Sequence, residues 1–137
     1  MSKQRVLFLC NANSARSLMG EALLRNMAGD EFDAFSAGVA PDAPQQHALA
    51  ALARAGVDNS GLASESIDRY RSQSFDAVIV LCQKAQQQCR QWDGQTDELL
   101  FWDIEDPRNE DTAVSYGRAL NEIRTRLQLW LAARSHH

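Results

Sequence analysis

The sequence predicts an α/β fold, a three-layer sandwich in which a four-stranded parallel sheet carries helices on both faces. Short apolar runs typical of strands alternate along the chain with segments whose apolar residues recur at helical spacing. Helical connections between successive strands favour parallel pairing. The run Val-Ile-Val-Leu at residues 78–81 is continuous rather than alternating, as expected for a strand that is buried on both faces.

The N-terminal half is predicted to contain two strands and two helices. Residues 5–9 form an apolar run typical of a buried strand, and residues 18–28 place their apolar side chains at helical spacing. A second short strand is predicted over residues 32–36. The second helix covers residues 47–55, and Gly56 ends it.

The C-terminal half continues the alternation of strands and helices. A short irregular or helical piece at residues 64–73 precedes the third strand, which covers residues 75–81. Residues 84–90 form a weakly patterned helix, and residues 99–102 form the fourth strand. A long amphipathic helix covers residues 114–133. Its apolar stripe consists of Leu120, Ile123, Leu127 and Trp130.

Length and composition indicate one globular domain over residues 1–137, large enough for a hydrophobic core. The net charge of −4 does not favour nucleic-acid binding, so affinity for an anion must be local. The N-terminal apolar run is too short for a signal peptide or a membrane span. Three cysteines, an odd number, favour a reducing compartment and chemical use of the thiols. We therefore expect a cytoplasmic protein without membrane or nucleic-acid partners, and a monomer is the default for the predicted fold.

The stretch V-L-F-L-C-N-A-N-S-A-R-S at residues 6–17 predicts a strand that delivers Cys10 to a loop, with a helix directly behind it. Backbone N–H groups of such a loop can converge on an anion. Arg16 adds a charged planar fork that suits a tetrahedral oxyanion, and this positive field favours the thiolate of Cys10. Ser17 can donate a hydrogen bond to the sulfur, and Asn13 tolerates a left-handed backbone. The predicted anion-binding residues are Asn11, Ala12, Asn13, Ser14, Ala15, Arg16 and Ser17. The alternative is a buried cysteine followed by a helix cap.

Two further cysteines, Cys82 and Cys89, follow the third predicted strand. On one helix they would lie about 10 Å apart along the axis, whereas a disulfide needs Cα atoms within about 7 Å. They can therefore bridge only if the segment between them unwinds, and its three glutamines and low apolar content should hold it weakly. Carboxyl ends of parallel strands meet at one edge, so Cys10, Ser36, Cys82 and the segment after Trp102 should lie together there. The alternatives are two incidental thiols or a zinc pair, although nearby His or Cys partners for zinc are lacking.

An acidic segment, W-D-I-E-D-P, follows the fourth predicted strand. Pro107 restricts Asp106 to extended geometry and so places its carboxylate on a rigid loop. Asp103 and Glu105 are alternative candidates for a working carboxylate, and acidic turns are commonly just solvated.

The octapeptide C-N-A-N-S-A-R-S resembles the phosphate loop of the low-molecular-weight protein tyrosine phosphatase superfamily, whose pattern is C-x5-R-S and which includes thiol-dependent arsenate reductases. The resemblance covers most of the chain. The C-x6-C pair after the third strand is similar to the thioredoxin-coupled arsenate reductases, and ordinary phosphatases of the superfamily lack it. An aspartate before proline is the general acid of the family, which implies that Asp106 protonates the departing oxygen. The residues after it, Arg108-Asn109-Glu110-Asp111, stand where tyrosine phosphatases usually carry aromatic residues.

The resemblance implies that the protein reduces arsenate to arsenite by a relay of three thiols. Cys10 attacks arsenate while Arg16 and the loop N–H groups stabilise the developing charge. Cys82 then attacks Cys10 and expels arsenite, and Cys89 attacks Cys82 to leave an accessible disulfide. An external thiol, from thioredoxin or from glutaredoxin with glutathione, closes the cycle, and no tightly bound cofactor is expected. The alternatives are a phosphatase that hydrolyses phosphomonoesters through a Cys10 phosphoenzyme, and an idle anion-binding or redox-sensing module.

A potassium site is also implied by the resemblance. Asn13, Glu21 and Ser36 match positions that support the loop and bind potassium in some arsenate reductases. The fourth position, usually Asp, is Glu65, and its extra methylene could shift or abolish the site.

Overall fold

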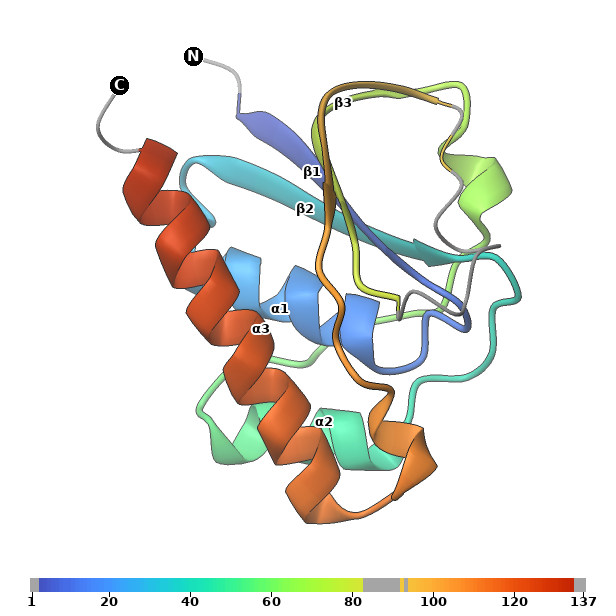
Figure 1. Ribbon diagram of the computed structural model, residues 1–137, viewed down its shortest axis with the longest axis vertical. Coiled ribbons are helices and arrows are strands. Elements are labelled where there is room, and N and C mark those ends of the chain that lie inside the picture. The colour runs from blue at the N-terminus through green and yellow to red at the C-terminus, as the bar shows by residue number, and fades with distance from the viewer. Residues whose placement is uncertain (1–2, 83–91, 93, 135–137) are drawn as a thin grey trace.

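The computed structural model describes residues 3–82, 92 and 94–134, and a four-stranded parallel sheet lies at its centre (Figure 1). The order of the strands is β2-β1-β3-β4, and all three pairs of neighbours are parallel. The strands are β1 Gln4–Cys10, β2 Phe32–Gly38, β3 Ser74–Val80 and β4 Gln95–Phe101. The predicted α/β fold with a parallel sheet is therefore confirmed.

Three α-helices pack together against one face of the sheet (Figure 1). They are α1 Arg16–Ala28, α2 Gln46–Arg54 and α3 Ala113–Arg134. Successive side chains of a strand point to opposite faces, and Val6 and Phe8 of β1 accordingly lie in the large core beneath these helices. The predicted stripe of the last helix faces the same core, since Leu120, Ile123 and Leu127 are buried there.

The opposite face of the sheet carries a smaller buried cluster, which includes Leu7 and Leu9 of β1. The short 3₁₀ helix η1 (Ile67–Arg69) covers part of this cluster. Next to η1, the rings of Phe35, Tyr70, Phe75 and Trp92 form a chain of contacts. The helix predicted over residues 84–90 lies outside the described residues.

Three strands are longer than predicted, and β1 extends one residue further at each end than the predicted residues 5–9. β2 continues through Gly38, because it pairs with β1 along the whole length of that strand. Ser36 consequently lies two residues before the end of β2 and not at its carboxyl end. β4 begins at Gln95, four residues before the predicted start. It is an edge strand, so its sequence is half-exposed and lacks the apolar run from which a strand start can be predicted.

The carboxyl ends of the strands bring distant parts of the sequence together. Beyond the strands themselves, the N–H of Leu81 donates a hydrogen bond of 2.7 Å to the carbonyl of Leu9, and the N–H of Trp102 donates one of 2.8 Å to the carbonyl of Val80. The segments after β1, β3 and β4 therefore start side by side. No helix within the described ranges is long and apolar enough to span a membrane.

Candidate functional site

The loop at residues 11–15, called the anion loop below, joins β1 to α1 and turns its carbonyl groups outward. Three of them accept hydrogen bonds of 2.9 Å from the backbone of the segment before α2. The pairs are Ala40 to Asn11, Asp42 to Ala12, and Gln45 to Ser14. The carbonyl of Asn13 accepts a 2.7 Å bond from the hydroxyl of Ser64. Within the described residues, no group accepts a hydrogen bond from the N–H groups of residues 12–15, so these donors are available to an anion.

The tight course of this loop depends on two special backbone positions. Asn13 has a φ of 47°, the left-handed conformation that asparagine was expected to tolerate in this loop. Gly38 at the end of β2 lies directly against the loop: a Cβ atom on this residue would stand 2.7 Å from the N of Asn13 and 2.8 Å from the O of Asn11. Gly38 was not predicted as a site residue, since nothing in the sequence distinguishes it from an ordinary turn glycine.

Cys10 is the last residue of β1, and its side chain is buried at the base of the loop. Its sulfur lies 2.9 Å from the hydroxyl of Ser17, so the two groups are in contact as predicted, and either atom can be the donor. The Ser17 hydroxyl in turn donates a 2.6 Å hydrogen bond to Oδ1 of Asn13, while the buried Nδ2 of Asn13 has no partner. A hydroxyl carries one hydrogen. Rotating the Asn13 amide by half a turn would pair Nδ2 with Ser17 and free the Ser17 hydrogen for a thiolate.

Arg16 is the first residue of α1, and its side chain is 2% exposed. Its Nη1 donates a 2.9 Å hydrogen bond to the carbonyl of Ile104, and its Nη2 lies 3.5 Å from Oδ2 of Asp106. Both partners belong to the loop after β4, so two segments 90 residues apart meet over the anion loop. These contacts fix the plane of the guanidinium group. A guanidinium held in this way can bind a tetrahedral oxyanion through two parallel N–H groups.

Asp106 is the buried member of the three carboxylates predicted for the loop after β4, whereas Asp103 and Glu105 are exposed. Burial acts to raise its pKa, but the hydrogen bonds from the side chain and backbone of Arg108, with the charges of Arg16 and Arg108, lower the pKa overall. In the free protein Asp106 is therefore a carboxylate at neutral pH. The role of Arg108 was not predicted.

Cys82 lies two residues after β3, is fully buried, and belongs to the same apolar cluster as Cys10. The hydrogen bond from Leu81 to Leu9 aligns the two strand ends that carry these cysteines. The predicted meeting of Cys10 and Cys82 at one edge of the sheet is therefore confirmed. In this structure Cys82 is in a disulfide and Cys10 is free. The prediction for Cys89 lies outside the described residues.

The four residues considered for potassium have other partners. Oε1 of Glu21 accepts a hydrogen bond from Ser36, and Oε2 lies 2.6 Å from Nη1 of Arg25. Burial, the largest influence, raises the pKa of Glu21. Glu65 is paired with Arg69 at 2.9 Å, and the Asn13 side chain accepts from Ser17. Each of the two carboxylates therefore has a guanidinium partner in this structure. No cluster of three metal-ligating side chains occurs in the part of the chain that the structure describes.

These ion pairs predict that potassium does not stimulate the protein. Replacing potassium by tetramethylammonium at constant ionic strength should leave kcat and KM unchanged, because Glu21 and Glu65 are already paired with Arg25 and Arg69. Steady-state kinetics with the reacting oxyanion checks this. A fall in kcat/KM that only potassium restores would contradict it.

Comparisons with known proteins agree with this geometry. The family model described as low molecular weight phosphotyrosine protein phosphatase matches residues 5–136. An arsenate reductase from Halalkalibacterium halodurans is 32% identical over 133 residues, which are 93% of this chain and 95% of that protein. A solved arsenate reductase in the phosphate binding state superposes with a TM-score of 0.83 at 25% identity, over 95% of this chain and 98% of that one. A thioredoxin-dependent arsenate reductase from Corynebacterium glutamicum superposes with a TM-score of 0.73 at 26% identity, over 98% of this chain and 64% of that one. The chain belongs to the low molecular weight phosphotyrosine protein phosphatase family, with arsenate reductases among its relatives.

Proposed function

We propose that this protein reduces arsenate to arsenite with its own thiols as the immediate electron donors. The observation that carries the proposal is the second buried cysteine, Cys82, at the strand end next to the one that bears Cys10. Hydrolysis of a phosphate ester needs one nucleophilic sulfur, whereas reduction needs a second sulfur that can reach the first. Named relatives support this choice, since the curated protein from Halalkalibacterium halodurans is an arsenate reductase.

The first step is attack of the Cys10 thiolate on arsenic. The predicted anion-binding residues, 11–17, hold the oxyanion through their backbone N–H groups and Arg16, and these donors stabilise charge that develops on its oxygens. The S–As bond forms and one As–O bond breaks, and the departing oxygen takes a proton and leaves as water. Asp106 delivers that proton as general acid. Because Asp106 is a carboxylate in the free protein, it must first receive a proton when arsenate binds.

The second step transfers an electron pair to arsenic. The sulfur of Cys82 attacks the sulfur of Cys10, the S–As bond breaks, and its electron pair reduces As(V) to As(III), which leaves as arsenite. Cys89 then attacks Cys82, so that Cys10 returns as a thiolate and a Cys82–Cys89 disulfide remains. At the end of this relay Cys10 is free and Cys82 is oxidised.

An external dithiol supplies the two electrons that reopen the disulfide. We propose thioredoxin, because the Corynebacterium glutamicum neighbour is thioredoxin-dependent, with glutaredoxin and glutathione as the alternative. A relay of free thiols requires a reducing compartment, so we propose that the protein works in the cytoplasm, as a monomer.

The proposal is tested by coupling arsenate turnover to thioredoxin, thioredoxin reductase and NADPH, and by following the loss of NADPH. A single turnover without reductant should leave one free thiol of the three in the chain. Retention of all three thiols after arsenate has reacted would contradict the relay.

Phosphomonoester hydrolysis is the second candidate, because the family model is that of a phosphatase and the first step is the same. Nitrophenyl phosphate hydrolysis, measured on the same preparation, gives the relative efficiency of the two reactions. A kcat/KM for nitrophenyl phosphate that far exceeds the value for arsenate would favour this second function.

A further inference from the structure

We infer that Arg108 is a positioning residue that clamps Asp106 while the anion loop is empty and releases it when an oxyanion binds. The inference rests on the proposed function, since it concerns how the proton donor of that reaction becomes available. It assigns a role to a side chain that lies outside the anion loop.

The clamp uses both oxygens of the carboxylate. Nη2 of Arg108 lies 3.0 Å from Oδ2 of Asp106, Nε lies 3.2 Å from Oδ1 and 3.3 Å from Oδ2, and the backbone N–H donates a 3.0 Å bond to Oδ1. This geometry arises because Asp106 caps the short 3₁₀ helix η3 (Pro107–Asn109). A carboxylate can accept all of these bonds, whereas a carboxyl group must use one oxygen as a donor. The clamped Asp106 is therefore a carboxylate without a proton, whereas a general acid must carry one.

The same carboxylate also faces the guanidinium of the anion loop, since Oδ2 of Asp106 lies 3.5 Å from Nη2 of Arg16. Asp106 thus balances two cations, one within the anion loop and one at its edge. The pKa of Arg108 is raised, first by its hydrogen bond to Asp106.

An oxyanion in the loop changes this balance. A guanidinium fork binds a tetrahedral oxyanion as well as it binds a carboxylate. The side chain of Arg108 is 30% exposed and long, so it can exchange Asp106 for the oxyanion at the mouth of the loop. Once Arg108 has left, burial dominates and raises the pKa of Asp106, which can then hold the proton needed by the departing oxygen.

The groups that interact electrostatically with Asp106 come from three elements. They are Arg108 on η3, Arg16 at the start of α1 and Tyr116 on α3. Burial and a hydrogen bond with Asp111 raise the pKa of Tyr116 to about 12, so it stays neutral at neutral pH. The charge balance at Asp106 therefore changes chiefly through the two arginines and through the oxyanion itself.

The experiment is a carbon NMR titration of the Asp106 carboxyl, with inorganic phosphate as the oxyanion. In the free protein, Arg108→Ala should raise the pKa of Asp106, because the hydrogen bonds and the adjacent positive charge of the Arg108 side chain are lost. Phosphate at saturation should raise the pKa in the unsubstituted protein and have a smaller effect in Arg108→Ala. An unchanged pKa on substitution, or on phosphate binding, would overturn the inference.

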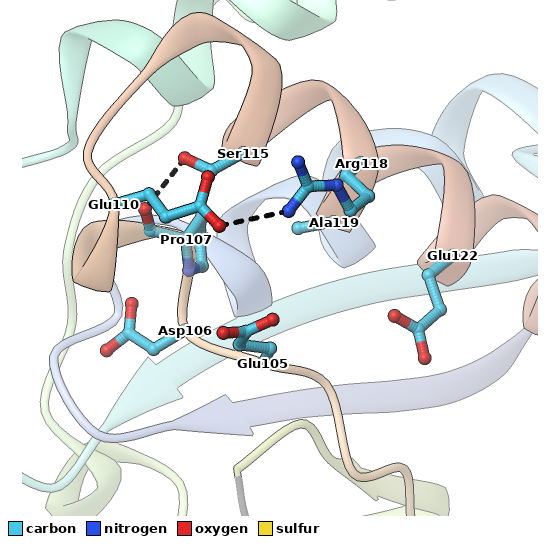
Figure 2. A pocket seen from close by; sticks show the side chains of 8 residues that line it. All are labelled: Glu105, Asp106, Pro107, Glu110, Ser115, Arg118, Ala119 and Glu122. Carbon is cyan, nitrogen blue, oxygen red and sulfur yellow. Dashed lines mark hydrogen bonds and ion pairs between the residues drawn. The ribbon is translucent and has the colours of Figure 1, made fainter.

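Two further variants keep the test decisive. Arg108→Lys retains the charge without the fork, so its pKa shift should be intermediate even if Arg108→Ala folds poorly. Arg118→Ala is the matched control: Arg118 pairs with Glu110 at 3.2 Å, and Figure 2 shows that the Asp106 carboxylate points away from this pair. The titration of Asp106 should be unchanged in this control.

Catalysis gives an independent readout. The high-pH limb of kcat/KM for arsenate should move to higher pH in Arg108→Ala, and KM should rise because one partner of the oxyanion is lost. The phosphate titration does not depend on arsenate reduction, so a protein that fails to reduce arsenate but shows the predicted titration refutes the function alone. A working reductase with an unshifted Asp106 refutes the role of Arg108 alone.

Discussion

Cys82→Ser is expected to abolish arsenate reduction and to leave hydrolysis of nitrophenyl phosphate near its original rate. A serine hydroxyl cannot attack the Cys10 sulfur to form a disulfide, so the relay stops after the first step. The hydrolytic reaction uses only the anion loop and the loop after β4, and Cys82 lies outside both. NADPH loss in the thioredoxin-coupled assay and release of nitrophenolate measure the two reactions.

Cys10→Ser is the control, and it should remove both reactions because it removes the nucleophile. Burial of the new hydroxyl in Cys82→Ser costs about 1–3 kcal/mol of stability, so thermal unfolding must show that the variant is folded at the assay temperature. Arsenate reduction at the original rate would exclude Cys82 from the relay. Loss of both reactions in a folded Cys82→Ser protein would mean that Cys82 only supports the anion loop.

The parts of the site that could be predicted are those that neighbouring residues determine. Cys10, the loop and Arg16 are contiguous in sequence, so an apolar strand followed by small polar residues and a helix sets their relative positions. The left-handed Asn13 and the contact of Ser17 with the sulfur follow from the same short stretch. The meeting of Arg16 with Asp106 spans 90 residues, and it was predictable only because carboxyl ends of parallel strands share one edge.

The parts that could not be predicted depend on backbone contacts or on local geometry. The segment before α2 orients the anion loop through its backbone N–H groups. Any residue type except proline can make such contacts, so the sequence does not indicate them. The contact of Arg108 with Asp106 requires the 3₁₀ turn of η3. This turn could not be predicted from the tripeptide Asp-Pro-Arg alone. The partners of Glu21 and Glu65 could have been found, since Arg25 and Arg69 each follow four residues later, the spacing of helical ion pairs.

Gly38→Ala is expected to remove oxyanion binding and, with it, both reactions. The added Cβ would lie 2.7 Å from the N of Asn13 and 2.8 Å from the O of Asn11, and backbone atoms cannot rotate away as a side chain can. The loop must therefore move, and its N–H groups lose their convergence. Loss of a single donor to an oxyanion lowers kcat by about 10²–10³-fold, and a shifted loop misplaces several donors at once.

Gly117→Ala supplies the matched control for this substitution. Gly117 lies in α3, and an added Cβ there meets nothing within 4 Å. Because alanine favours a helix over glycine by about 1 kcal/mol, this variant should unfold at a slightly higher temperature and keep full activity. Titration with inorganic phosphate, followed by phosphorus NMR, should show binding in Gly117→Ala and none in a folded Gly38→Ala. Undiminished phosphate affinity in Gly38→Ala would mean that β2 does not hold the loop in its anion-binding shape, and the convergence of N–H groups would then have to arise from the segment before α2 alone.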